Sequence, residues 1–168
     1  TPTHRLGTYY LETGYGIRPR KVVYDRKHSA FSEYDFSKTD VKKLLAVYTW
    51  LHLSGITPAL GTKCRNLIMT CLKTAKESGM TVSFDGNFRS TLWSWEEARD
   101  FCTCCLPYVD VLFGIEPYHI WKDEEDHNAG DVKDDIPFQP DLEQQEKVFR
   151  AFVKRYPNIK CIVRHVRY

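Results

Sequence analysis

The stretch that decides the fold runs from residue 81 to residue 89 and reads Thr81-Val82-Ser83-Phe84-Asp85-Gly86-Asn87-Phe88-Arg89. An apolar strand leads directly into an acid, an amide and a guanidinium. In an open α/β sheet, ligands bind just beyond the carboxyl ends of the strands. Arginine offers a planar, permanently charged fork that suits phosphate or carboxylate better than lysine does. The stretch therefore predicts a strand that ends in a binding site for an anion.

The segments around this stretch alternate between strand and helix patterns. We expect strands at 49–53, 82–84, 109–113 and 160–166, and helices at 41–47, 64–78, 95–106 and 142–156. Gly79 is placed to end the second helix, and Ser94, with Glu97 three residues later, to begin the third. This alternation is typical of parallel βαβ units with right-handed crossovers. It predicts an α/β fold with a doubly wound, mostly parallel sheet, in which 49–53 is a buried strand.

The first thirty residues have a different pattern. Residues 7–12 and 21–26 read as β-strands, and residues 14–19, which contain glycine and proline, read as the turn between them. Two strands alone are only marginally stable in water. We therefore expect this hairpin to pack on the rest of the protein or on a second copy of the chain.

The overall composition excludes several classes of protein. The chain has 168 residues and a net charge of +2, so no strong positive charge favours nucleic acid, and no stretch approaches the ~20 apolar residues of a membrane span. The Cys102-Thr103-Cys104-Cys105 segment has no second Cys/His pair at zinc-finger spacing. We interpret the six cysteines as reduced, structural residues of a cytosolic protein, and we expect no metal site among them.

Four segments occur in an order that is specific in combination. They are Gly7-x-Tyr9, Val23-Tyr24-x-Arg26, Leu51-His52-Leu53-Ser54-Gly55-Ile56-Thr57 and Ser83-Phe84-Asp85-x-Asn87-Phe88-Arg89-x-x-Leu92-Trp93. In these segments the chain resembles the 2-keto-3-deoxygluconate kinases of the ribokinase (pfkB) family of carbohydrate kinases, densely from about residue 5 to 115 and thinly afterwards. The resemblance implies a ribokinase-like sheet with a small β-lid. Residues 1–34 would be the lid segment and residues 35–168 a partial α/β sugar-kinase domain.

The resemblance also implies an activity and a set of binding residues. The activity would be transfer of a phosphoryl group from ATP, with Mg²⁺, to the 6-hydroxyl of a sugar acid in the cytoplasm. Tyr9 and Tyr24 would contact the sugar from the lid, Arg26 would hold its carboxylate, and Ile56 would contact it through its backbone. Arg89 would reach the phosphoryl group or the acid, as a possible phosphoryl stabiliser.

The same residues have structural interpretations that stay open. Tyr9 and Tyr24 could be a cross-strand packing pair, and Arg26 an exposed charge on a strand. Asp85 and Asn87 could satisfy backbone groups at the turn. We also expect the side chain of Ile56 in the core. We interpret His52 as a core residue and Trp93 as a packing residue.

The catalytic base of the family stands in a Gly-Ala-Gly-Asp or Gly-Gly-Gly-Asp motif that opens a late helix. This chain offers only Asn128-Ala129-Gly130-Asp131, in an acidic segment followed by Pro137, and we do not interpret Asp131 as the base. The family's Asn-x-x-Glu motif is also absent, which leaves Glu116 as a weak candidate for a metal-linked acid. We therefore expect an internal piece of a longer protein that lacks both ends of the domain, has no catalytic residue, and is inactive alone.

Two other functions are compatible with the sequence. Another ribokinase-family sugar kinase, such as a fructokinase, would not need Arg26 for its neutral substrate. A non-catalytic association module could instead form a homo-oligomer through the strand edges of the lid. A dinucleotide-binding oxidoreductase is disfavoured, because no G-x-G-x-x-G motif follows a strand.

Overall fold

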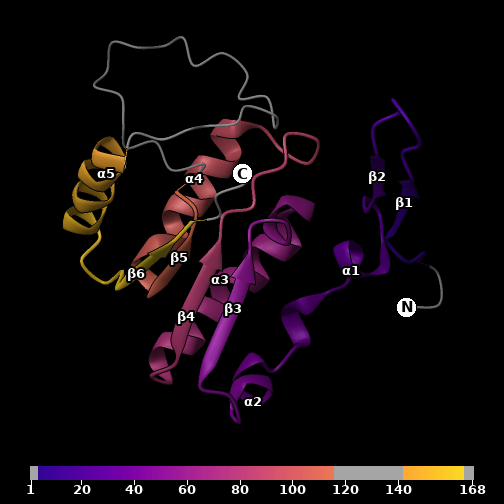
Figure 1. Cartoon of the computed structure of the whole chain (residues 1–168). Coiled ribbons are helices and arrows are strands. Elements are labelled where there is room, and N and C mark those ends of the chain that lie inside the picture. The colour runs from indigo at the N-terminus through magenta and orange to yellow at the C-terminus, as the bar shows by residue number, and fades with distance from the viewer. Residues whose placement is uncertain (1–3, 116–141, 165–168) are drawn as a thin grey trace.

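A computed structural model describes residues 4–115 and 142–164 of the chain. Strands β1 (Thr8–Glu12) and β2 (Lys21–Asp25) form an antiparallel hairpin. A separate parallel sheet contains, in spatial order, β3 (Trp50–Ser54), β4 (Thr81–Asp85), β5 (Val111–Phe113) and β6 (Cys161–Val163). Figure 1 shows the hairpin set apart from this sheet. The predicted hairpin and the predicted parallel α/β sheet are both confirmed.

Three long helices accompany the parallel sheet. Helix α3 (Thr62–Glu77) connects β3 to β4, α4 (Trp95–Cys105) connects β4 to β5, and α5 (Leu142–Arg155) precedes β6. Because the strands follow one another in a single direction across the sheet, right-handed crossovers place these helices on the same face. The remaining elements are short: α1 (Ala30–Glu33), α2 (Val41–Leu45), and 3₁₀ turns at Phe36–Lys38, Pro58–Leu60 and Leu106–Tyr108.

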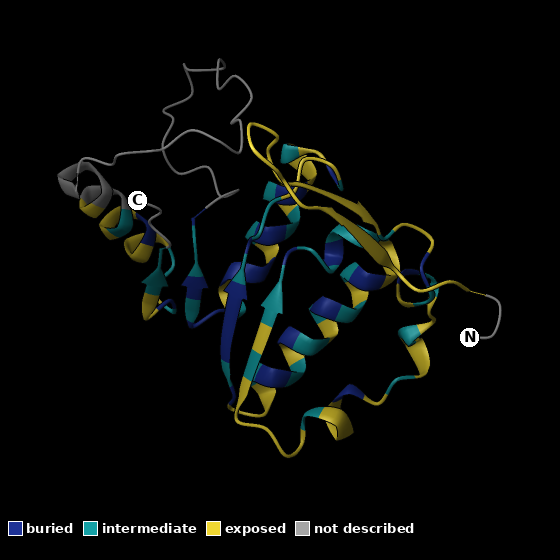
Figure 2. Cartoon of the chain, turned by 45° about the vertical axis from the view of Figure 1, so that its right-hand side comes forward, coloured by how far each residue is buried: buried dark blue, intermediate teal, exposed yellow. Residues whose placement is uncertain are grey.

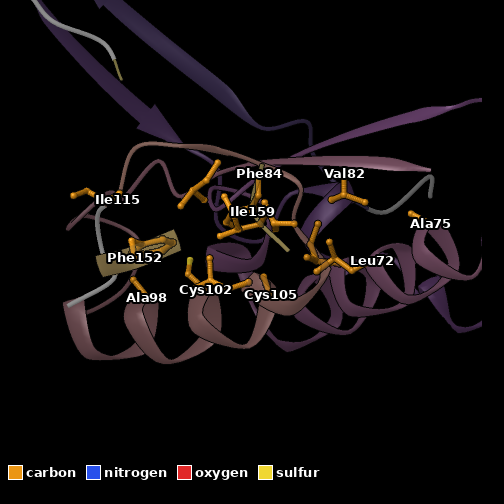
Figure 3. Close-up of a cluster of buried hydrophobic side chains, with 14 of the residues drawn as sticks. Leu72, Ala75, Val82, Phe84, Ala98, Cys102, Cys105, Ile115, Phe152 and Ile159 are labelled. Carbon is orange, nitrogen blue, oxygen red and sulfur yellow. The ribbon is translucent and has the colours of Figure 1, made fainter. Parts of the chain in front are cut away.

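The core lies between this face of the sheet and the helices. Alternate residues of the strands point into it, among them Val82, Phe84 and Leu112, all fully buried. The helices contribute Ile68, Leu72, Ala75, Ala98, Cys102, Cys105 and Phe152 to the same cluster. Figure 3 shows Val82 beside Leu72, with Phe84, Cys102 and Cys105 in the same buried cluster. These two cysteines are therefore packing residues, as the sequence predicted.

The ends of the helices follow the local sequence signals. The Ser94 hydroxyl accepts a hydrogen bond from the Glu97 amide at 3.1 Å, and the Glu97 carboxylate accepts one from the Ser94 amide at 3.2 Å. This reciprocal capping satisfies two amides that have no partner inside the helix. Helix α3 ends before Gly79, whose φ of 69° lies in the left-handed region. Both predicted helix boundaries are confirmed.

Strand β3 differs from the prediction. It lies at the edge of the described sheet, and Trp50 and His52 are exposed rather than buried. The indole nitrogen of Trp50 donates to the Ser83 hydroxyl at 2.9 Å, and His52 Nδ1 lies 2.8 Å from the same hydroxyl. The prediction of a core histidine is wrong, because His52 is exposed on a strand at the edge of the described sheet. Trp93, by contrast, is buried and packs in the core as predicted.

Asp110 joins three elements at the amino end of β5. Its carboxylate oxygens lie 2.9 Å from Lys76 Nζ in α3, and one of them accepts a hydrogen bond from the Val82 amide at 2.9 Å. Lys160, before β6, approaches to 3.6 Å. Burial raises the pKa of Asp110, but the Val82 amide and the Lys76 ammonium outweigh that effect and leave the pKa below its usual range.

Candidate functional site

A pocket lies between the end of the hairpin and the loop that follows β4. Its volume is about 140 Å³. The residues that line it are Tyr24, Asp25, Arg26, Lys27, Arg89, Thr91 and Leu92. The structure therefore brings together three of the residues predicted to bind substrate, Tyr24, Arg26 and Arg89, from segments that are more than sixty residues apart in the sequence.

The loop after β4 is shaped by a turn at the end of the strand. The Asp85 carboxylate accepts a hydrogen bond from the Asn87 amide at 3.0 Å, and Asn87 adopts a positive φ of 38°. The carbonyl of Arg89 then accepts from the Leu92 amide at 2.9 Å, which turns the chain again. The structure thus supports the interpretation of Asp85 as a residue that satisfies a backbone group at the turn. These two turns bring Arg89, and with it residues 91 and 92, to the pocket.

A close backbone approach fixes the same edge of the sheet. The Gly55 amide, just after β3, donates to the Asp85 carbonyl at 2.8 Å. A Cβ atom on Gly55 would lie 2.0 Å from the carbonyl oxygen of Gly86, which no side chain tolerates. Gly55 therefore allows the loops after β3 and β4 to pack directly on each other.

The hairpin supplies the other wall of the pocket. Tyr9 and Tyr24 are opposite each other in the strand register, on one face of the hairpin, with ring centroids 6.2 Å apart. The packing interpretation is therefore correct for this pair. Tyr9 is nevertheless 66% exposed and Tyr24 51% exposed, so both rings keep free surface for a ligand. Figure 2 shows that the whole hairpin is exposed.

Positive charge gathers at the mouth of the pocket. Among the ion pairs between described residues, none involves Arg26, Lys27 or Arg89. Asp25 is the only carboxylate among the lining residues, and it is paired with Arg5, with Nη2 and Oδ1 2.5 Å apart. Two guanidinium groups and an ammonium group therefore remain available, beside an aromatic ring, for an anionic ligand.

Some predicted residues do not line the pocket. Tyr9, opposite Tyr24 in the hairpin, is not among the lining residues. Ile56 is not among them either; it is half-buried, and its amide donates to the Ser54 hydroxyl at 3.4 Å. Glu116 and Asp131 lie outside the described residues. Four lining residues were not predicted, Asp25, Lys27, Thr91 and Leu92, although each lies within three residues of a predicted arginine in the sequence.

The described part of the chain holds no ready site for a metal. Within residues 4–115 and 142–164, no group of three or more histidine, cysteine or acidic side chains could bind an ion. All six cysteines are free of disulfide bonds, and burial raises the pKa of the Cys105 thiol, so that it stays protonated.

Of the helices in these ranges, none is long and apolar enough to cross a membrane.

Comparison with known proteins places the chain among carbohydrate kinases. The family described as pfkB family carbohydrate kinase matches residues 1–117. A 2-dehydro-3-deoxygalactonokinase of Haloferax volcanii is 43% identical over 115 residues, which cover 67% of this chain and 35% of that protein. A 2-dehydro-3-deoxygluconokinase of Dickeya dadantii is 30% identical over 112 residues, which cover 64% of this chain and 36% of the relative.

A solved structure of a related kinase supports the same family. The crystal structure of a 2-dehydro-3-deoxygluconokinase from Thermotoga maritima superposes with a TM-score of 0.76 at 37% identity, over 94% of this chain and 45% of that one. The chain thus spans less than half the length of the relatives that it matches. The matched part includes both walls of the pocket.

Proposed function

Because the chain belongs to the pfkB family of carbohydrate kinases, we propose that it forms the acceptor-binding part of a sugar-acid kinase. The observation that carries this proposal is the pocket in which Arg26 and Arg89 meet beside the Tyr24 ring. A sugar acid needs a guanidinium for its carboxylate and an aromatic face and hydroxyl for its ring or chain. The names of the relatives, kinases of 2-dehydro-3-deoxy sugar acids, support the same substrate class.

Five residues have a role in the proposal, three that line the pocket and two, Tyr9 and Ile56, that do not. Arg26 holds the carboxylate with two parallel hydrogen bonds, and Tyr24, with Tyr9 beyond it, contacts the carbon chain and hydroxyls. Arg89 reaches the carboxylate or the phosphoryl group in transfer. Ile56 contacts the substrate through its backbone. Residues 1–34 act as a lid that excludes water, and residues 35–168 supply the sheet edge on which the substrate rests.

The reaction we propose for the intact protein is phosphoryl transfer from ATP to the 6-hydroxyl of 2-keto-3-deoxygluconate or its galacto epimer. Bound ATP, with Mg²⁺, would supply the phosphoryl group, and such an enzyme is expected in the cytoplasm. The described residues do not offer a set of ligands for Mg²⁺, so we assign neither group to residues here. We expect the 168-residue chain to bind the acceptor without phosphorylating it, because its sequence lacks the glycine-rich motif with the catalytic base.

Calorimetric titration of the 168-residue chain tests the substrate class. We expect 2-keto-3-deoxygluconate and 2-keto-3-deoxygalactonate to bind at least about tenfold more tightly than fructose, since only the acids can pair with Arg26. Fructose binding as tightly as the acids would favour a fructokinase instead. A parallel assay with ATP and Mg²⁺ checks the expected inactivity, and measurable phosphorylation of the sugar acid would contradict it.

A second candidate function is association through the lid, and one observation favours it. Every residue of β1 and β2 is exposed, including Tyr10 and Val23 on one face and Leu11 and Val22 on the other. A hairpin with two exposed faces gains stability by pairing with a second copy. Light scattering of the chain and of variants with serine at Leu11 or Tyr10 tests this. A monomer at all concentrations would rule it out.

A further inference from the structure

The acid in the pocket poses a problem for a site that binds anions. Asp25 lines the pocket together with Arg26, Lys27 and Arg89. A free carboxylate in a space of about 140 Å³ would repel an anionic substrate. It would also compete with that substrate for the same cations. The pocket can favour an acid only if the charge of Asp25 is engaged elsewhere.

Arg5, which lies outside the pocket, forms an ion pair with the Asp25 carboxylate. Arg5 Nη2 donates to the Asp25 carboxylate at 2.5 Å and to the Lys27 carbonyl at 2.5 Å, while Nη1 donates to the Asp25 carbonyl at 3.3 Å. The guanidinium thus binds the two residues that flank Arg26. Arg5 itself is not among the residues that line the pocket.

The backbone of Arg5 is fixed as well. Its carbonyl accepts a hydrogen bond from the Ala30 amide at 2.7 Å, and Arg5 and Ser29 form a parallel bridge. The chain therefore enters and leaves the hairpin side by side, and Arg5 stands at this base. A contact at the base of a hairpin can set the direction of the side chains just beyond the strand end, including Arg26.

We infer that Arg5 is a positioning residue that gives the pocket its preference for anions. It withdraws the Asp25 carboxylate from Arg26, Lys27 and Arg89, so that these cations stay available to the substrate. The inference rests on the proposed function, because it assumes that the pocket takes a sugar acid. The chemical step needs no contact between Arg5 and the substrate.

Substitutions at both ends of the pair separate a charge effect from a purely structural one. The variants are Arg5→Gln, Asp25→Asn and the double variant, each titrated with 2-keto-3-deoxygluconate by calorimetry. We expect Arg5→Gln to weaken binding by roughly tenfold, the effect of one uncompensated charge in a half-exposed site. We expect the double variant to regain affinity within about twofold of the wild-type chain, because no acid is then released.

The opposite pattern overturns the inference. If the double variant binds as weakly as Arg5→Gln, Arg5 only holds the backbone, and if Arg5→Gln binds normally, it has no role in the site. Should Arg5→Gln fail to fold, Arg5→Lys takes its place. Lysine keeps the charge but cannot reach three acceptors at once, so nearly normal binding supports the charge effect and a tenfold loss contradicts it.

A measurement without substrate keeps this test separate from the proposed function. Hydrogen exchange of the arginine Nε–H groups is followed by NMR in the wild-type chain and in Arg5→Gln. We expect exchange at Arg26 or Arg89 to slow in the variant, as the released Asp25 carboxylate pairs with one of them. Unchanged exchange at both contradicts the inference. If the wild-type chain binds no sugar acid but this slowing is seen, the substrate proposal fails and the role of Arg5 stands.

Discussion

The guanidinium carbon of Arg26 lies 4.2 Å from the centre of the Tyr24 ring. This stacking holds a flexible cation over a partly exposed aromatic face and leaves the edge of the guanidinium free to donate hydrogen bonds. Both residues line the pocket, with Arg89 across it. The pair therefore joins the two properties expected of a sugar-acid site, a fork for a carboxylate and a surface for carbon and hydroxyl groups.

Replacing Arg26 should separate acidic from neutral sugars. In Arg26→Ala we expect the affinity for 2-keto-3-deoxygluconate to fall by about tenfold to a hundredfold, the range for a lost charge-assisted hydrogen bond. Fructose binding should change by less than about twofold. Calorimetry measures both, with Arg20→Ala as a control that removes an exposed lid arginine outside the pocket. Equal losses of affinity for the two sugars would contradict the proposal that Arg26 binds the carboxylate.

Replacing Tyr24 should show how much of the Arg26 orientation comes from the ring. Tyr24→Phe keeps the aromatic face, whereas Tyr24→Leu removes it and should cost about 1 kcal/mol of binding energy, or roughly fivefold in affinity. The ring also shifts the NMR signals of the Arg26 side chain, and we expect that shift to persist in the phenylalanine variant only. The same Arg26 signals in both variants would show that stacking does not position the guanidinium.

Replacing Gly55 should destabilise the edge of the sheet. A Cβ atom there meets the Gly86 carbonyl oxygen at 2.0 Å, so the loops after β3 and β4 must move apart. We expect Gly55→Ala to lower the free energy of unfolding by about 2 kcal/mol or more. Gly7→Ala is a suitable control, since its Cβ would make only ordinary contacts, the nearest at 3.6 Å. Urea unfolding measures both, and equal stability of the two variants would contradict the close approach.

Replacing Asp110 should change how stability depends on pH. Its pKa is lowered in the folded chain, so its contribution is present above the unfolded pKa and is lost as the pH falls through the folded value. Asp110→Asn should cost about 3 kcal/mol at pH 7, because Lys76 loses its buried partner. It should also flatten the loss of stability below about pH 5. Urea unfolding at several pH values measures this.

Asp100→Asn provides the control for that series. Asp100 is exposed and pairs with its neighbour Arg99 on the surface, so its removal should change the free energy of unfolding by less than about 0.5 kcal/mol. If Asp110→Asn changed the free energy of unfolding as little as Asp100→Asn does, the pairing of Asp110 with α3 and β4 would contribute little to stability.

Local signals in the sequence predicted most of the fold. The Ser94–Glu97 capping pair and Gly79 act within a few residues of themselves, and the structure confirms the helix ends they indicate. The alternation of strands and helices likewise predicted the parallel order. His52 was misinterpreted because apolar neighbours identify a strand but do not reveal whether it lies inside a sheet or at its edge.

The pocket was predicted only in part. Tyr24, Arg26 and Arg89 came from the family resemblance, and their convergence depends on the hairpin lying against the loop after β4. Arg5 gave no signal, because its partners at 25 and 27 follow twenty residues later and the contact forms only when the hairpin closes. A salt bridge between residues at the two ends of a hairpin has no spacing pattern that a sequence could show.

NMR mapping of the sugar-acid site tests the central claim most directly. The 168-residue chain, labelled with ¹⁵N, is titrated with 2-keto-3-deoxygluconate, and the amide shifts are assigned along the sequence. We predict saturable shifts concentrated at residues 24–27 and 89–92, the two walls of the pocket. Saturable binding that shifts neither segment, or no binding at millimolar concentrations of the acid, would contradict the account.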